Sequence, residues 1–102
     1  MKLYIAGKIT GNPGYRREFG TWARKFRMDG YIVMNPANLP EGMEASDYMR
    51  ICFAMVDSAD AVFMIPGWQD SRGARTEWNY ARYIGKQILT AAGLDQAGLE
   101  VE

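Results

Sequence analysis

Short apolar runs alternate with longer amphipathic segments along this chain. Four runs are almost continuously apolar, as buried parallel strands are, and they cover residues 3–6, 31–34, 60–65 and 87–91. Between them, apolar side chains recur at helical spacing over residues 13–29, 46–59 and 71–84. Strands that alternate with helices of this length form βαβ units with right-handed crossovers. The pattern therefore predicts a small doubly wound α/β fold of the flavodoxin or Rossmann type, a three-layer sandwich with a parallel sheet of four to five strands.

Capping and turn-forming residues predict where these elements begin and end. Asn12 and Pro13 suit the N-cap and the first position of the first helix, and Ser46 or Asp47 suits the N-cap of the second. Residues 37–45 are expected to form a loop. The loops 7–11, 35–45 and 66–72 all fall at the carboxyl ends of the predicted strands, where such sheets bind ligands. We expect one domain over residues 1–92 and a small, polar, acidic tail over residues 93–102, with an edge strand at 99–101 as one option for that tail.

The composition restricts the partners and the chemistry. The 102 residues include 12 basic and 12 acidic side chains, so no net charge would attract a nucleic acid polymer or a membrane. No apolar run approaches the roughly 20 residues that span a bilayer, and no signal-peptide pattern is present, so we expect a cytoplasmic protein. With no histidine and one cysteine, neither imidazole chemistry nor a thiolate metal site is expected. We expect neither a metal nor a cofactor.

The segment 66–77 is the strongest candidate for a functional site. A glycine-containing turn follows the third apolar run, and a helix is expected to open at Ser71. The Ser71 hydroxyl and the N–H groups of Gly73 and Ala74 could hold a phosphate at this helix N-terminus. Ser71 could equally serve only as the N-cap. The glycine-flanked loop 7–11 offers further donors at the end of the first strand, although a plain strand-to-helix turn explains it as well.

Glu77 lies in the second turn of the same predicted helix. At about 100° per residue, its side chain falls on the inward side, where a lone carboxylate is costly to bury. It either faces a wet pocket or forms an ion pair with Arg50 or Arg24, and geometry alone does not separate the two. Beside a helix N-terminus the carboxyl is expected to stay ionised.

Four motifs occur together in one order along the chain. They are residues 3–11 (LYIAGKITG), 35–37 (NPA), 47–50 (DYMR) and 66–77 (PGWQDSRGARTE). In these motifs the chain resembles a family of uncharacterised proteins, frequent in phages and prophages, within the nucleoside 2-deoxyribosyltransferase superfamily. The resemblance covers roughly residues 1–91 and implies the same α/β fold.

The resemblance implies roles for individual residues. The relatives include nucleoside 2-deoxyribosyltransferases and 2′-deoxynucleoside 5′-phosphate N-hydrolases, which cleave the bond between base and deoxyribose with a glutamate that matches Glu77. Tyr4 matches a tyrosine at the active-site end of the first strand, and Ser71 and Gly73 match phosphate-binding residues. Cys52 stands where relatives carry an aspartate that positions the sugar and transfers protons. Because a thiol does not easily replace a carboxylate, three outcomes follow: catalysis is slow, is supported by Asp47, Asp70 or Tyr4, or is lost.

The loop 7–11 matches one that wraps the 5′-phosphate, with Lys8 and Thr10 in place of a serine and an arginine. Together with residues of the motifs 35–37 and 66–77, this loop supplies the candidate substrate- and phosphate-binding residues. They are Gly7, Lys8, Ile9, Thr10, Gly11, Asn35, Trp68, Ser71 and Gly73. The implied function is an N-glycosidase or deoxyribosyltransferase-like enzyme that acts on a nucleoside 5′-monophosphate. Alternatives are a catalytically weak or inactive module that binds a nucleotide or a nucleotide sugar and, last, a pure interaction protein. Relatives complete their sites with a neighbouring subunit, so the resemblance also implies a homodimer or larger homo-oligomer.

Overall fold

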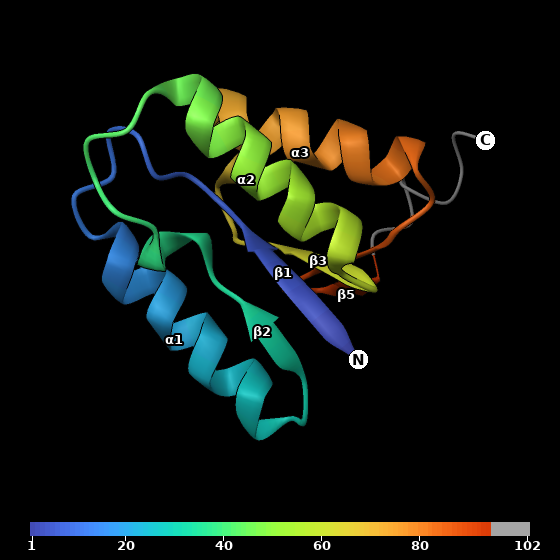
Figure 1. Cartoon of the computed structure of the whole chain (residues 1–102). Coiled ribbons are helices and arrows are strands. Elements are labelled where there is room, and N and C mark those ends of the chain that lie inside the picture. Colours follow the sequence, from blue (N-terminus) through green and yellow to red (C-terminus); the bar gives the residue numbers. More distant parts are fainter. Residues whose placement is uncertain (95–102) are drawn as a thin grey trace.

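A five-stranded sheet lies between one helix on one face and two helices on the other (Figure 1). This is seen in a computed structural model, which describes residues 1–94. The elements, in chain order, are β1 (Lys2–Ala6), α1 (Tyr15–Met28), β2 (Ile32–Met34), η1 (Pro36–Asn38), α2 (Ala45–Ser58), β3 (Ala61–Met64), η2 (Trp68–Asp70), α3 (Arg72–Tyr83), β4 (Gln87–Thr90) and β5 (Gly93–Leu94), where η marks a 3₁₀ helix.

The strand order is β2-β1-β3-β4-β5, and the first four strands are parallel. From the central strand β1, the chain winds through α1 to β2 on one side, and β3 and β4 lie on the other. The direction of winding thus reverses between β1 and β3, which is where ligands bind in open α/β sheets. The predicted doubly wound, three-layer sandwich with a parallel sheet is confirmed.

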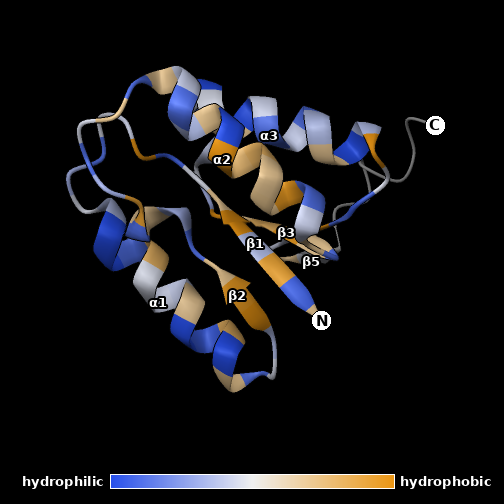
Figure 2. Ribbon diagram, viewed as in Figure 1, coloured by the Kyte–Doolittle hydropathy of each residue, from blue (hydrophilic) through white to orange (hydrophobic). Residues whose placement is uncertain are grey.

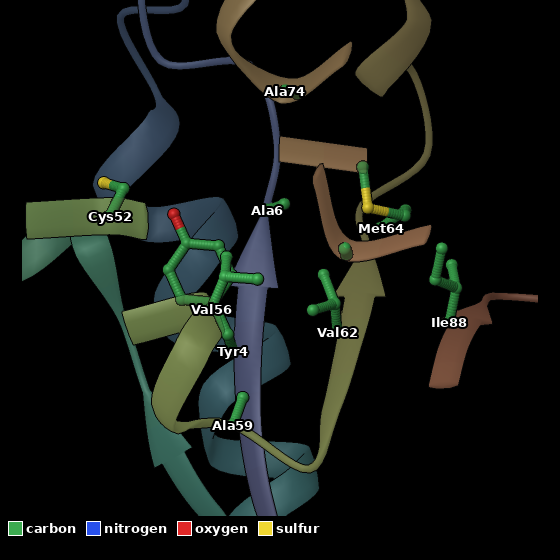
Figure 3. Packing of buried hydrophobic residues seen from close by; sticks show 10 residues of the cluster. Tyr4, Ala6, Cys52, Val56, Ala59, Val62, Met64, Ala74 and Ile88 are labelled. Carbon is green, nitrogen blue, oxygen red and sulfur yellow. The ribbon is translucent and has the colours of Figure 1, made fainter. Parts of the chain in front are cut away.

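Alternate residues of each strand contribute to two separate cores. Leu3 and Ile5 of β1 point to the α1 face and pack with Phe19 and Phe26. Tyr4 and Ala6 point the other way, into the core beneath α2 and α3. Figure 3 shows this second core, and Figure 2 shows the apolar strands lying between helices that carry polar residues. Because both faces are covered, β1 and β3 are apolar almost throughout.

The first helix begins later than predicted. Its N-cap is Gly14, and α1 starts at Tyr15 rather than at Pro13. The expected capping role of Asn12 is therefore wrong. The Asn12 side chain instead donates to the Lys8 carbonyl at 2.9 Å and to Glu18 Oε1 at 3.0 Å. These bonds stabilise the loop after β1, and they occupy the side-chain amide of Asn12, which therefore does not cap the helix.

The second helix begins earlier than predicted. Its N-cap is Glu44, whose backbone N–H donates to Asp47 Oδ2 at 3.1 Å. Asp47 is thus the third residue of the helix and reaches back to the cap, and neither Ser46 nor Asp47 is the cap itself. Part of the expected loop 37–45 is also helical, because the Asn35 side chain accepts the Ala37 N–H and starts η1.

The sheet extends beyond the last predicted strand. After β4 the chain turns back, and β5 pairs antiparallel with β4 through Thr90↔Gly93 and Leu89↔Leu94. The start of the expected tail therefore contributes to the sheet. The optional strand at 99–101 lies outside the described residues. Over residues 1–94 no helix combines the length and apolarity that a membrane crossing requires.

Candidate active site

A pocket of about 880 Å³ opens at the carboxyl ends of β1 and β3, at the switch point of the sheet. Segments far apart in sequence form its walls: the end of β1 and the loop that follows, the first two turns of α1, Pro36 with the segment 39–43, the first half of α2, and residues 70–74, 76 and 77 at the start of α3. In Figure 1 the loops that lead into α1 and α2 lie on this same side of the molecule.

The N-terminus of α3 forms the polar wall of the pocket. Gly67, with a φ of +90°, turns the chain after β3, and η2 leads directly to Ser71. The Ser71 Oγ accepts the Ala74 N–H at 3.1 Å and is the N-cap of α3. Ser71 also lines the pocket, so its O–H is available to a ligand while its lone pair caps the helix. The cap is therefore compatible with a ligand bound by the Ser71 hydroxyl, but the Ala74 N–H predicted for the phosphate is already bonded to Ser71 Oγ.

Gly7 and Gly73, both in the pocket wall, differ in the space that a side chain would have there. A Cβ at Gly7 would lie 3.0 Å from Ile65 Cβ and 3.1 Å from Phe19 Cζ, so this position is closed by core packing. A Cβ at Gly73 would meet only Ser71 Oγ, at 4.0 Å. Gly7 lets the chain leave β1 against the core, whereas Gly73 leaves open space beside the helix N-terminus.

Glu77 lies in the wall of the pocket with only 7% of its surface exposed. It comes from the second turn of α3 and faces the core between α3 and β1. Burial raises the pKa of Glu77 to about 7, although hydrogen bonds from Tyr4 and Cys52 act in the opposite direction. The expectation that this carboxyl stays fully ionised is therefore wrong at neutral pH, since desolvation outweighs the donors around it.

In residues 1–94, Glu77 does not form the ion pair with Arg50 or Arg24 that the sequence left open. Within residues 1–94, Arg50 pairs with Asp47 at 3.2 Å, and the other ion pairs are Arg16–Glu41 and Lys25–Asp29. Glu77 takes part in none of them. Tyr4 and Cys52 hydrogen-bond to its carboxyl, and none of the ion pairs in residues 1–94 supplies a countercharge.

Tyr4 and Cys52 complete the buried cluster around Glu77. Tyr4 is 1% and Cys52 6% exposed, and Figure 3 shows the Tyr4 hydroxyl directed toward Cys52. Burial and the nearby Glu77 raise the pKa of Tyr4 well above its usual value, and burial raises that of Cys52 to about 11. Both groups are therefore neutral hydrogen-bond donors at physiological pH.

The structure brings together most of the residues predicted for the site. The pocket is lined by Tyr4, Gly7, Ile9, Thr10, Cys52, Asp70, Ser71, Gly73 and Glu77. Four other candidates, Lys8, Gly11, Asn35 and Trp68, are not among its lining residues. Asn35 caps η1, and the ring of Trp68 stacks on Trp78 with 5.5 Å between centroids. In the described part of the chain, no three His, Cys, Asp or Glu side chains gather as a metal site.

Another wall of the pocket combines part of the predicted loop 35–45 with a face of α2 that was not predicted to line the site. It consists of the segment 39–43 and of Ala45, Tyr48 and Met49, which line the pocket together with Cys52. Positions 45, 48, 49 and 52 follow the i, i+3, i+4, i+7 spacing of one helix face. That spacing is visible in the sequence, but it does not distinguish a face that lines a cavity from one that is packed in the core.

Comparison with known proteins connects this arrangement to an enzyme fold. No curated protein matches the sequence. The structure is similar to that of a 2-deoxyribosyltransferase from the psychrotolerant bacterium Bacillus psychrosaccharolyticus, with a TM-score of 0.70 and 20% identity, over 88% of this chain and 71% of the other. A family model described as a domain of unknown function, DUF4406, matches residues 1–90. The chain therefore belongs to the DUF4406 family.

Proposed function

We propose that this protein cleaves the N-glycosidic bond of a deoxynucleoside 5′-monophosphate, with Glu77 as the nucleophile. The observation that carries the proposal is the Glu77 carboxyl, buried in the wall of a large pocket and held by hydrogen bonds without an ion-pair partner among the described residues. A carboxyl kept in such a position at an energetic cost is typical of a functional group. The fold shared with a 2-deoxyribosyltransferase supports this class of reaction.

In the proposed reaction, a Glu77 carboxylate oxygen bonds to C1′ of the sugar as the bond from C1′ to the base nitrogen breaks. The base leaves with the electron pair and takes a proton from a water molecule, which becomes hydroxide. Water or a second base then attacks C1′ and releases the Glu77 carboxylate, and the proton that the attacking group loses neutralises that hydroxide. The carboxylate stabilises the positive charge that develops at C1′ before it bonds there.

The polar wall suits the 5′-phosphate of such a substrate. Ser71 retains an O–H to donate, and Gly73 leaves room for close approach to the N–H groups at the start of α3. Thr10, on the loop after β1, lines the same pocket. These groups would fix the sugar so that C1′ lies near Glu77, which is the main contribution that a binding site makes to such a reaction.

The test is release of free base from a panel of deoxynucleoside 5′-monophosphates, with Glu77→Gln as the matched variant. We expect Glu77→Gln to lower kcat by about 10³-fold or more while the fold is retained. In the wild type, kcat/KM should rise with pH through about 7 and level off above, because the nucleophile must lose its proton. Equal base release by the two proteins would contradict the role of Glu77.

Cys52 favours a second candidate function, a nucleotide-binding module without turnover. With a pKa of about 11, its thiol does not act as the proton acceptor that a carboxylate would be. This candidate predicts that monophosphates raise the melting temperature but yield no free base. Turnover that appears only in Cys52→Asp would identify a pocket that binds without cleaving, whereas turnover by the wild type would exclude this candidate.

We also infer that the protein assembles as a homodimer or larger homo-oligomer. This rests on the resemblance, whose members complete their sites with a neighbouring subunit. Sedimentation equilibrium gives the subunit number directly. A monomer that retains full base release would show that one chain forms the whole site.

A further inference from the structure

The segment 39–43 forms a wall of the pocket and has no regular structure of its own. It runs between η1 and α2, and all five of its residues line the pocket. Gly42 gives the segment a sharp turn, with a φ of +90°. A wall of this kind keeps its shape only where neighbouring elements hold its backbone in place.

Tyr48, in the first turn of α2, holds this segment at both ends of the turn. Its hydroxyl donates to the Pro40 carbonyl at 2.6 Å and accepts the Met43 N–H at 3.2 Å. The single O–H is thus already committed to the backbone. Tyr48 acts on the pocket chiefly through the wall that it holds.

Arg16, on α1, contacts the same segment from the other helix. Its guanidinium lies 3.4 Å from Glu41 Oε2 and 3.4 Å from the Leu39 carbonyl. Both members of the ion pair are more than half exposed, at 51% and 79%, and exposed pairs of this kind contribute little. The two hydrogen bonds of Tyr48 are shorter, at 2.6 Å and 3.2 Å, and are therefore the main attachment of the wall.

We propose that Tyr48 is a positioning residue, which holds residues 39–43 in the shape that the substrate contacts. The inference rests on the proposed function, because the wall must take part in substrate binding. Removing the Tyr48 hydroxyl frees the wall but leaves Glu77, Tyr4 and Ser71 in place. The loss falls on substrate binding, and the chemical step continues once the substrate is bound.

Tyr48→Phe is the test, and Tyr80→Phe is its control. Tyr80 also donates a 2.6 Å hydrogen bond, to Asp57, but it does not line the pocket. Two measurements are made on each variant: the exchange rate of the Met43 amide, and kcat and KM for the monophosphate that the wild type cleaves fastest. We expect Tyr48→Phe to speed Met43 exchange about tenfold and to raise KM about fivefold, with kcat within about twofold. Tyr80→Phe should change none of these quantities.

The exchange measurement needs no substrate, so it separates this proposal from the proposed function. Unchanged Met43 exchange in Tyr48→Phe would show that the hydroxyl does not hold the wall and would overturn the inference. Faster exchange with an unchanged KM would also overturn it, because the wall would then not contact the substrate. Absence of turnover in the wild type, with faster exchange in Tyr48→Phe, would refute the proposed function. In that case the monophosphate Kd replaces KM, and an equal Kd in both proteins overturns the inference.

Discussion

At the scale of single residues, the Glu77 carboxyl is the most unusual group in the molecule. Its 7% exposure raises its pKa to about 7, even though Tyr4 and Cys52 both hydrogen-bond to it. Helical spacing was enough to place Glu77 on the inward side of α3. Its protonation could not be predicted, because it depends on how completely α2 and β1 exclude water from the carboxyl.

The raised pKa makes the stability of the protein depend on pH. Below its ordinary pKa of 4.5, Glu77 is protonated in both the folded and the unfolded chain, and its burial costs little. Between pH 4.5 and about 7 the unfolded chain loses this proton while the folded protein keeps it, so the free energy of unfolding falls as pH rises. Each unit of pKa difference corresponds to about 1.4 kcal/mol.

We therefore expect Glu77→Gln to be more stable than the wild type at pH 8, by about 2 to 3 kcal/mol, and close to it at pH 4.5. Urea unfolding at several pH values measures the difference. Glu41→Gln is the control, because Glu41 is exposed, and its replacement should not produce this pH dependence. A difference between Glu77→Gln and wild type that stays constant with pH would show that Glu77 titrates normally.

At the scale of elements, the centres of the helices and strands followed from the sequence, and so did the Ser71 cap of α3, but the first residues of α1 and α2 did not. Helical periodicity identified α1 and α2, but Asn12 and Ser46 are not their caps. Several polar residues near each start can serve as the cap, and tertiary contacts decide among them. Asn12 is held by Lys8 and Glu18 in the loop, contacts that no local pattern indicates.

The junction between β1 and its loop provides a test at this scale. Gly7→Ala should lower the free energy of unfolding by about 1 to 3 kcal/mol, because the added Cβ would crowd Ile65 and Phe19. Gly73→Ala is the matched control: it adds the same methyl group in open space within α3, where alanine favours the helix by up to about 1 kcal/mol. Thermal unfolding of both variants gives the comparison. Equal stability of the two variants would mean that Gly7 is not tightly packed.

At the scale of the whole molecule, the alternation of strands and helices was enough to predict the layers and the edge of the sheet that holds the pocket. The switch point between β1 and β3 brings residues 4, 52 and 77 together across the chain. The antiparallel β5 was not predicted, because two residues carry no recognisable periodicity. The segment 39–43 was predicted to lie at this edge as part of the loop 35–45, but its shape was not predicted, because that shape comes from Tyr48 and Arg16 rather than from its own sequence.

The half-protonated state of Glu77 at neutral pH has a consequence for the heat of ligand binding. The chain has no histidine, so this carboxyl is the described side chain that exchanges protons with the buffer near pH 7. An anionic phosphate that enters the pocket favours the neutral carboxyl and draws a proton from the buffer. The measured enthalpy would then vary with the ionisation enthalpy of the buffer, and the slope would count the protons taken up by Glu77 together with those that the phosphate, whose second pKa is about 6, gains or loses.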